Sequence, residues 1–301
     1  MVVAAPADAL RALAPVLGEP DGTPEPLEGG ITNRNYRVRW ADRECVLRCP
    51  GKDTALLGID RAAEWAATQA AAAAGIGPPV VAFDPGAGCL VTEWVEARPI
   101  EPAGLRRRIP ELAAALRTIH SGPGLPATFD AFAVVDAYLE IALARGAAPP
   151  RGIAGLVTGA DRIRAALTGP EHAPVPCHND LLAANVLDDG ERLWIVDWEY
   201  AGMGDRFFDL GNLAVNNGFD EDDEVALLRA YWPDGSTERR FAALRLMRVM
   251  SDFREGMWGV VQATVSELEF DFEGYAREHL DRVAAALEDP RQAGWLEDAR
   301  G

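Results

Sequence analysis

The stretch CHNDLLAANVLDDGERLWIVDWEYAG, residues 177–202, places His178, Asp180 and Asn185 in one short loop, and its apolar run LWIV leads directly into Asp197. Phosphoryl transfer from ATP needs a carboxylate that accepts or orients the proton of the attacking hydroxyl, and oxygen ligands that hold Mg²⁺ against the phosphates. Asp and Asn side chains that converge from a loop and a strand end form the hard oxygen site that Mg²⁺ prefers. The stretch therefore favours metal-assisted phosphoryl transfer.

Length and composition indicate an ordinary globular protein. The chain has 301 residues, enough for two lobes, with 49% hydrophobic and 25% charged residues. No apolar run approaches the length that spans a bilayer. The first 17 residues lack a basic region, and Asp8 interrupts their apolar stretch, so we expect no signal peptide and a cytoplasmic location.

The net charge argues against nucleic acid as a partner, and the cysteine spacing argues against a zinc site. A net charge of −18 opposes binding to nucleic-acid phosphates, whereas it is compatible with a cationic substrate. The chain has one Lys, Lys52, so roles that other proteins give to Lys must fall to it or to Arg. The cysteines show no CxxC spacing, so we expect buried thiols and no zinc site; they are Cys45, Cys49, Cys89 and Cys177.

Apolar periodicity divides the chain into two parts. The first part predicts a helix at 6–17, strands within 27–40 and 43–49, a helix at 59–75 with Asp60 and Gly75 as caps, and strands in PPVVAFD and GCLVTEWV. The second part predicts mostly helices, at 102–120, 129–146, 153–168, 206–217, 220–231, 236–263 and 270–288, with short strands near 174–177, 184–188 and 192–197.

This order of elements predicts an α+β fold with two lobes. The boundary is expected near residues 95–99, which gives a small N-lobe over 1–96 and a larger, mostly helical C-lobe over 97–301. A cleft between two such lobes is a common place for a ligand.

The motifs of the opening stretch also resemble a known family. His178-Asn179-Asp180 with Asn185 is similar to the catalytic loop of protein-kinase-like enzymes, in the H-x-D-x-x-x-x-N form typical of aminoglycoside phosphotransferases and choline kinases. Asp197-Trp198-Glu199 resembles that branch's counterpart of the kinase D-F-G. The text HNDLLAANVL…IVDWEYAG…FFDLGN resembles bacterial choline/ethanolamine kinases, and the likeness runs from about residue 27 to residue 285.

The resemblance implies a two-lobed protein-kinase-like fold, with an antiparallel sheet and one helix in the N-lobe, and it implies ATP and Mg²⁺ as cofactors. Asp180 would be the catalytic base or the carboxylate that orients the acceptor hydroxyl, and His178 would support the loop. Asn185 and Asp197 would bind Mg²⁺. Asp209, near the start of a helix, would hydrogen-bond the backbone of the catalytic loop.

The N-lobe contains a candidate phosphate-covering hairpin, GGITNRNY, between two strands. Its glycines allow close backbone approach, and its polar side chains could donate to phosphate oxygens; the candidates are Gly29, Gly30, Thr32, Asn33 and Asn35. It is not a Walker A loop, because no GK[ST] follows.

Other nucleotide-binding candidates follow this hairpin. By resemblance, Arg48 takes the place of the kinase Lys, where Arg can contact phosphate through a bidentate fork, and Glu64 would be its ion-pair partner. Lys52 is a second candidate anchor. Glu93-Trp94-Val95 resembles the hinge between lobes, where backbone groups of Glu93 and Val95 would hold adenine.

The acceptor site is expected in the C-lobe. A quaternary ammonium has no N–H to donate, so aromatic faces and carboxylates recognise it. Trp258 and Tyr275 match positions that line the choline pocket of the family. Glu255 stands where eukaryotic members have a second Trp, and Asn216 stands where they have an acidic residue.

These departures bear on specificity, since a carboxylate at position 255 could favour a primary ammonium, which donates hydrogen bonds. Glu199 is a further substrate-binding candidate. Trp258 can equally be a core residue, because spacing does not separate an aromatic box from a packed stripe. Four other aromatic residues are expected to pack: Trp232, Phe253, Phe270 and Phe272.

The sequence therefore favours a kinase that transfers the γ-phosphate of ATP to the hydroxyl of a cationic aminoalcohol, choline or ethanolamine. Thiamine or an aminoglycoside are alternative acceptors with the same chemistry. A kinase-like protein that binds nucleotide without turnover is another alternative. A protein kinase fits poorly, because only about ten residues separate Asp197 from the next helix, too few for a peptide-docking segment.

Overall fold

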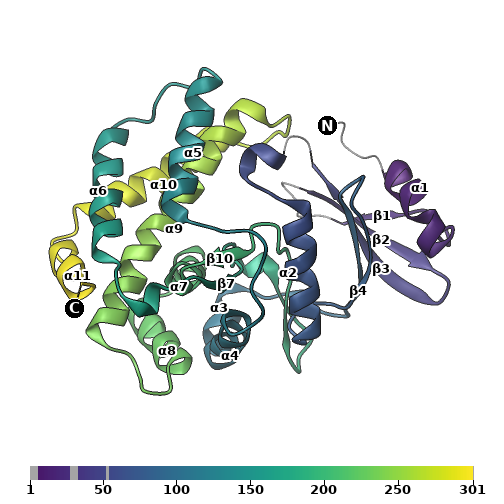
Figure 1. Ribbon diagram of the computed structural model, residues 1–301, viewed down its shortest axis with the longest axis horizontal. Helices are drawn as coiled ribbons and strands as arrows, with labels where there is room; N and C mark the ends of the chain where they lie inside the picture. The colour runs from purple at the N-terminus through teal and green to yellow at the C-terminus, as the bar shows by residue number, and fades with distance from the viewer. Residues whose placement is uncertain (1–5, 28–32, 52–53, 301) are drawn as a thin grey trace.

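The computed structural model describes residues 6–27, 33–51 and 54–300, and it has two lobes joined side by side (Figure 1). An antiparallel sheet builds the smaller lobe, and helices build most of the larger one. The two-lobed α+β fold that the sequence predicts is thus confirmed. The N-terminal helix lies at the outer side of the small lobe, and the C-terminus lies at the far end of the other (Figure 1).

Five strands form the N-lobe sheet, in the order β1-β2-β3-β5-β4. Their bounds are β1 (Glu25–Leu27), β2 (Asn33–Trp40), β3 (Arg43–Pro50), β4 (Val80–Asp84) and β5 (Cys89–Glu93). Successive side chains of a strand point to opposite faces, so β3 buries Cys45, Leu47 and Cys49 on one side. Ala9 and Leu13 of α1 (Pro6–Leu17) pack on this apolar face.

The helix α2 (Arg61–Ala73) lies between the sheet and the C-lobe (Figure 1). The Asp60 carboxylate accepts the N–H groups of Ala62 and Ala63, so the expected N-cap is confirmed. The C-cap is Ala74, and Gly75 follows it with a φ of +71°, so the expected C-cap is off by one residue. The predicted helix 59–75 is too long by two residues at each end, because it included the capping residues.

The apolar core of α2 belongs to the C-lobe. Ala67 and Ala71 of α2 share one apolar cluster with the helices of the C-lobe, whereas the sheet and α1 form a separate cluster. The short 3-10 helix η1 (Thr54–Leu57) adds a direct link, since the Tyr138 hydroxyl donates to the Leu57 carbonyl at 2.9 Å. The proposed boundary at residues 96 and 97 therefore separates the sheet from most helices but does not separate the two apolar cores.

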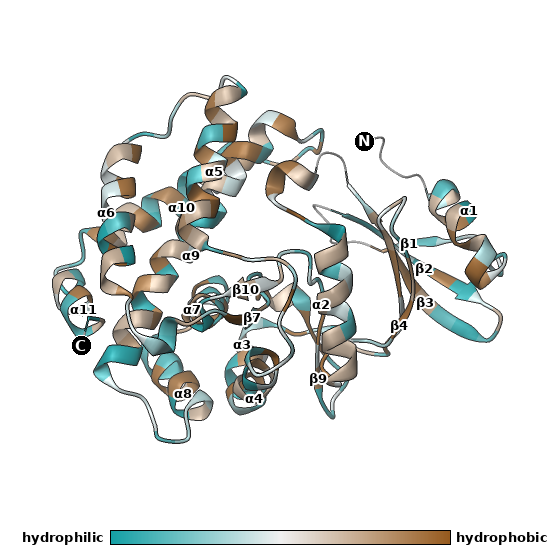
Figure 2. Cartoon of the chain, viewed as in Figure 1, coloured by the Kyte–Doolittle hydropathy of each residue, from teal (hydrophilic) through white to brown (hydrophobic). Residues whose placement is uncertain are grey.

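Helices dominate the C-lobe, and several carry apolar and polar stretches side by side, as amphipathic helices do (Figure 2). They are α3 (Pro102–Arg107), α4 (Ile109–His120), α5 (Ala131–Ala144), α6 (Ile153–Ala166), α7 (Arg206–Asn216), α8 (Glu221–Tyr231), α9 (Glu238–Val265), α10 (Phe272–Leu287) and α11 (Gln292–Asp298). The single helix predicted at 102–120 is wrong, because Pro110 has no N–H to continue it and a break occurs at Arg108.

Short strands lie on both sides of the loop at residues 178–185. β7 (Val175–Cys177) pairs with β10 (Gly202–Gly204), and β8 (Val186–Asp188) pairs with both β6 (Arg98–Pro99) and β9 (Leu193–Ile195). β6, β10, η1, α11 and two further 3-10 turns, η2 (Pro170–His172) and η3 (Ala183–Asn185), were not predicted. A Cβ on Gly204 would lie 3.0 Å from the Phe129 carbonyl oxygen, so a side chain at this position would require the neighbouring backbone to shift.

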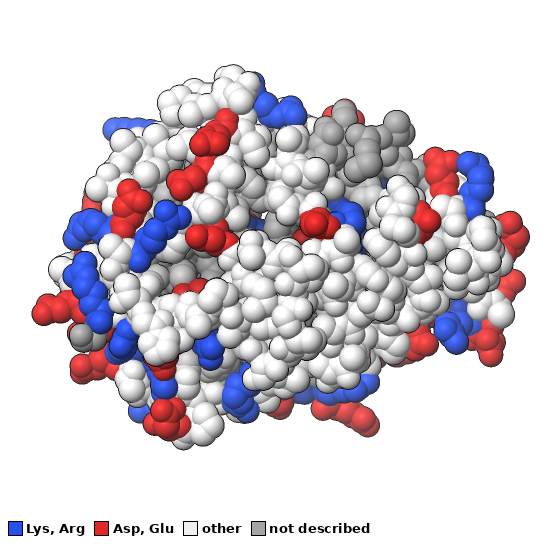
Figure 3. Space-filling view, in the orientation of Figure 1, with Lys and Arg blue, Asp and Glu red and all other residues white. Residues whose placement is uncertain are grey.

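The described helices include none that is long and apolar enough to cross a bilayer. All four cysteines are free and buried, as the sequence predicts. On the face shown in Figure 3, Asp and Glu alternate with Arg around both lobes, and the described residues there form no continuous basic surface.

Candidate active site

The loop at residues 178–185 follows β7 and is held by α7. The Asp209 carboxylate accepts the backbone N–H of His178 at 2.8 Å and that of Asn179 at 2.6 Å. The amide oxygen of Asn212, one turn later on α7, accepts the N–H of Leu181 at 2.5 Å. The role expected for Asp209 is thus confirmed. These bonds fix the loop even though Asn179 has a φ of +67°, a strained value for a residue with a side chain.

A buried polar network extends behind Asp209. His120 Nε2 lies 3.0 Å from the Asp209 carboxylate, and His120 Nδ1 lies 2.6 Å from the Tyr231 hydroxyl. With Cys177, these groups could be mistaken for a metal site, because one atom of each of His120, Cys177 and Asp209 lies within 4.8 Å of the others. Burial raises the pKa of the Cys177 thiol, and the Asp209 oxygens already accept backbone hydrogen bonds, so the network is structural.

His178 links the loop to the segment that follows β9 and contains Asp197. Its Nδ1 accepts the N–H of Asp180 at 3.2 Å, so Nε2 carries the proton and donates to the Val196 carbonyl at 2.9 Å. Burial lowers the pKa of His178, which keeps the ring neutral. A neutral His178 with a hydrogen bond at each ring nitrogen supports the loop, and neither nitrogen is free to take part in catalysis.

Asn185 and Asp197 lie on the two segments that flank the open end of the β8–β9 hairpin. The N–H of Val196 donates to the Asn185 carbonyl at 3.0 Å, which sets Asp197 beside the loop. Asn185 Nδ2 donates to the Asp180 carbonyl at 2.9 Å and approaches its carboxylate at 3.3 Å, so the amide oxygen is the atom left for a cation. Asp197 has a φ of +66°, another strained value, and its side chain is 30% exposed. A carboxylate and an amide oxygen on two adjoining segments are ligand types that a hard divalent cation takes.

Arg48 is surrounded by carboxylates. Its Nη1 lies 3.0 Å from Glu64, which confirms the expected ion pair. Its Nη2 lies 2.5 Å from Asp197 and 3.3 Å from Glu199. Burial alone would lower the pKa of Arg48, but these three carboxylates raise it above its ordinary value, so the guanidinium stays charged.

A second basic residue, Arg61, joins this cluster and was missed from the sequence. It lies 2.6 Å from Glu64 and 3.4 Å from Glu199, and it donates to the Asn33 amide oxygen at 2.9 Å. The signal was its place three residues before Glu64 on a predicted helix, where side chains share one face. Asn33 in turn donates to Glu199 at 2.8 Å.

Glu199 therefore lies on the N-lobe side of the site. The sequence placed Glu199 among the acceptor-binding candidates. Among the described residues, however, its hydrogen bonds and ion pairs join it to Asn33, Arg48 and Arg61 and not to Glu255, Trp258 or Tyr275. Burial, followed by the nearby Asp197 charge, raises the pKa of Glu199 to about 7.

The remaining N-lobe candidates are partly described. Gly29, Gly30, Thr32 and Lys52 lie outside the described residues. Asn35 on β2 is the strand partner of Arg48 on β3, so it lies at the same level of the sheet. The hinge candidates lie at and just after the end of β5. The N–H of Glu93 donates to the Pro79 carbonyl at 2.8 Å. The Val95 carbonyl accepts the N–H of Ala97 at 2.9 Å, where the chain enters the C-lobe.

Asp180 is connected to the acceptor candidates through Arg254, another residue that we missed. Arg254 Nη1 lies 3.3 Å from the Asp180 carboxylate and also hydrogen-bonds Glu255. The Tyr275 hydroxyl donates to the other oxygen of Glu255 at 2.9 Å. Since 254, 255 and 258 fall on neighbouring positions of one helix face, the spacing could have indicated Arg254.

Trp258 is 7% exposed and meets Tyr275 edge-on, with ring centroids 5.7 Å apart. Thus Asp180, Glu255, Tyr275 and Trp258 come together, as the sequence predicts for the acceptor side. Of the aromatic residues expected to pack, Trp232, Phe253 and Phe272 are buried. That expectation is wrong for Phe270, which is 44% exposed because it lies in the loop between α9 and α10.

Asn216 lies at the end of α7, next to α9. One turn earlier, Asn212 donates to the Ser251 hydroxyl of α9 at 3.0 Å. Within the described chain, its buried Nδ2 has no hydrogen-bond partner.

The pKa of Asp180 reflects its surroundings. Burial raises it to about 8; the Arg254 charge opposes this rise, and Glu255 adds to it. A buried carboxylate of this kind can take up a proton, which suits a group that receives one from a hydroxyl.

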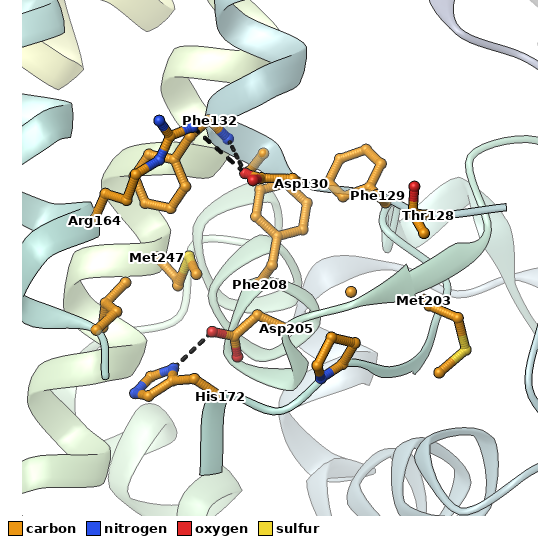
Figure 4. A pocket seen from close by; sticks show the side chains of 14 residues that line it. Thr128, Phe129, Asp130, Phe132, Arg164, His172, Met203, Asp205, Phe208 and Met247 are labelled. Atoms are coloured by element: carbon orange, nitrogen blue, oxygen red, sulfur yellow. Dashed lines mark hydrogen bonds and ion pairs between the residues drawn. The ribbon is translucent and has the colours of Figure 1, made fainter. Parts of the chain in front are cut away.

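A separate cavity of about 340 Å³ lies beyond β10 and contains none of the candidate residues (Figure 4). Its walls are mainly apolar, with Phe129, Phe208 and Met247 among them. Its polar groups pair with one another: His172 lies 2.6 Å from Asp205, and Arg164 lies 3.8 Å from Asp130 (Figure 4). This cavity offers no convergent chemical groups, so the candidate active site is the cluster around Asp180.

Comparison with known proteins agrees with this geometry. The phosphotransferase enzyme family matches residues 23–245. Ethanolamine kinase 2 of Mus musculus is 29% identical over 282 residues, 82% of this chain and 71% of that protein. The probable choline kinase 1 of Arabidopsis thaliana is 25% identical over 301 residues, 85% of this chain and 84% of that protein. The solved structure of a choline/ethanolamine kinase family protein from Mesorhizobium loti is 34% identical, with a TM-score of 0.83, covering 98% of this chain and 99% of that one. The chain therefore belongs to the phosphotransferase enzyme family, in its choline/ethanolamine kinase branch.

Proposed function

We propose that the protein is a cytoplasmic kinase that transfers the γ-phosphate of ATP, with Mg²⁺, to the hydroxyl of a small cationic aminoalcohol, choline or ethanolamine. The observation that carries the proposal is the position of Asn185 and Asp197 on adjoining segments, with Asn185 Nδ2 3.3 Å from the Asp180 carboxylate. One group that receives a proton and two oxygen ligands for a cation are what phosphoryl transfer to a hydroxyl requires.

The nucleotide side of the proposal rests on the N-lobe. Arg48, held by Glu64, would contact phosphate oxygens, and Asn33 and Asn35 would border them on β2. The backbone of residues 93–95 would receive adenine. Mg²⁺, held by Asn185 and Asp197, would neutralise charge on the phosphates.

In the transfer step, Asp180 takes the proton of the acceptor hydroxyl as its oxygen bonds to the γ-phosphorus, and ADP leaves. Asn185 orients Asp180 through the hydrogen bonds from its Nδ2. His178 holds the backbone N–H of Asp180 and so keeps the carboxylate facing the site.

The acceptor side favours a primary ammonium. Glu255 uses one oxygen for Arg254 and the other for Tyr275, but a carboxylate has about four lone-pair positions and can accept more N–H groups. Trp258 is buried and packed edge-on, so it presents little free aromatic face to a quaternary ammonium. We therefore place ethanolamine ahead of choline. The relatives named ethanolamine kinase and choline kinase support both candidates.

The direct experiment is ADP release from Mg·ATP by the purified protein, with choline, ethanolamine, thiamine and an aminoglycoside in parallel. We expect turnover with ethanolamine and less with choline. Turnover with thiamine or the aminoglycoside alone would keep the kinase chemistry and change the acceptor. Binding of Mg·ATP without turnover of any acceptor would favour the non-catalytic alternative, which the presence of Asp180, Asn185 and Asp197 argues against.

A further inference from the structure

The 178–185 loop brings no positive charge to the site. Between Asp180 and Asn185 it contains only Leu181, Leu182 and two alanines. During phosphoryl transfer, negative charge is spread over the three equatorial oxygens of the group, and enzymes stabilise it with metal ions and basic side chains. The basic group on the acceptor side must therefore come from elsewhere in the fold.

The basic residues of the N-lobe cluster are already engaged. Arg48 contacts Glu64, Asp197 and Glu199, and Arg61 contacts two of these three carboxylates. Both side chains lie on the side where the nucleotide is expected. Neither forms an ion pair with Asp180 in the described part of the protein.

Arg254 lies on the acceptor side, and among the described residues it leaves two buried nitrogens without a hydrogen-bond partner, whereas Arg48 and Arg61 each leave only Nε. It is 2% exposed, and its Nη1 lies 3.3 Å from the Asp180 carboxylate. Its guanidinium carbon lies 4.1 Å from the centroid of the Tyr200 ring, in the segment that follows Asp197. The guanidinium thus lies between the residue proposed to take the proton and the segment after the proposed metal ligand.

Two nitrogens of Arg254 have no hydrogen-bond partner within the part of the chain that the structure describes. Nε and Nη2 are buried, and neither has a hydrogen-bond acceptor among the residues described. A buried N–H without a partner is costly, and a bound ligand is one way in which such a group is satisfied. The N–H donors of a planar, permanently charged guanidinium suit phosphoryl oxygens. The cationic group of an aminoalcohol would be repelled by the guanidinium and is not its ligand.

We propose that Arg254 binds the phosphoryl group during its transfer, through Nε and Nη2, and is a further catalytic residue of this chain. The inference rests on the proposed function. The bond from the γ-phosphorus to the ADP oxygen breaks, the bond to the acceptor oxygen forms, the hydroxyl proton goes to Asp180, and Arg254 keeps its own protons. Glu255, bonded to Arg254 Nη1, holds the guanidinium in place.

The test uses fluoroaluminate, a mimic of the transferring phosphoryl group, because it needs no knowledge of the acceptor. The affinity of Mg·ADP is measured by calorimetry with and without fluoroaluminate for the parent, Arg254→Met and Arg254→Lys. A transition-state mimic should bind more tightly than the ground state, so we expect an increase of about tenfold or more in the parent. The increase should be lost in Arg254→Met and partly kept in Arg254→Lys, with similar Mg·ADP affinity in all three.

A matched control is Arg248→Met, which removes a partly buried guanidinium from the same helix. Arg248 pairs with Glu224, and Glu224 keeps Arg245 as a second partner at 2.7 Å. This variant should be less stable to heat but retain the full fluoroaluminate effect. If Arg254→Met does not fold, Arg254→Lys supplies the answer.

The outcomes separate the two proposals. Mg·ADP binding with equal fluoroaluminate effects in the parent and both Arg254 variants, including no effect in any, overturns the role of Arg254 and leaves the proposed function intact. No Mg·ADP binding by the parent overturns the proposed function and the inference with it. Where the acceptor is turned over, loss of Arg254 should also lower kcat by about 10²–10³-fold with little change in KM.

Discussion

The Asp209 carboxylate accepts the backbone N–H groups of His178 and Asn179 at 2.8 and 2.6 Å, and so one side chain of α7 sets the course of the 178–185 loop. Asp209 is fully buried, and His120 is its third partner. The loop enters the site through Asn179, whose φ of +67° is costly without such support.

Asp209→Asn should therefore destabilise the protein by about 3 kcal/mol, because an amide nitrogen would face a backbone N–H and leave a buried donor unpaired. Urea unfolding measures the change. Asp220→Asn is the control: Asp220 is the exposed N-cap of α8, where Asn caps as well as Asp, so its stability should stay near that of the parent. Equal stability of the two variants would contradict the role of Asp209.

Asp180→Asn and Asp180→Ala should each lower kcat by about 10²–10⁴-fold, since the acceptor hydroxyl loses the group that takes its proton. The affinity for Mg·ATP should stay close to that of the parent, because the expected nucleotide ligands are on other residues. Steady-state kinetics and calorimetry give the two values. Near-normal kcat in both variants would exclude Asp180 from the chemistry.

Asp197→Ala should abolish the part of nucleotide binding that depends on Mg²⁺, because Asp197 supplies the only carboxylate of the proposed ligand pair. ATP binding is compared with and without Mg²⁺ by calorimetry. Since Arg48 also loses a partner at 2.5 Å, binding of ATP without metal is the internal control for damage to the N-lobe cluster. A variant that binds Mg·ATP as the parent does would show that Asp197 is not a ligand.

Glu255→Gln should raise the KM for ethanolamine by about tenfold or more and change the KM for choline less, because a charged N–H···O bond is lost only with a primary ammonium. Tyr275→Phe is the comparison: it removes one hydrogen bond to Glu255 and keeps both the carboxylate and the ring, so a smaller rise is expected. Kinetics with both alcohols measure the ratio. Equal changes for the two acceptors would place the ammonium elsewhere.

Much of the fold could be predicted because its signals are local. The periodicity of residues 6–17 and the N-cap Asp60 depend on near neighbours in the chain. Elements of two or three residues, such as β6 and β10, were missed because they exist only through pairing with distant strands. The core shared by α2 and the C-lobe was missed for the same reason, since periodicity shows which face is apolar and not what covers it.

The 178–185 loop and Asp197 could be predicted from residue types, order and spacing along the chain, and the Arg48–Glu64 pair from the family resemblance. Where long side chains end depends on the packing of distant elements and could not be predicted. Arg254 reaches Asp180 across 74 positions of the chain, and Asn33 reaches Glu199 across 166. Such contacts depend on how α9 and the sheet pack against the loop, and burial then makes an unpaired Arg254 donor significant, because no water competes for it.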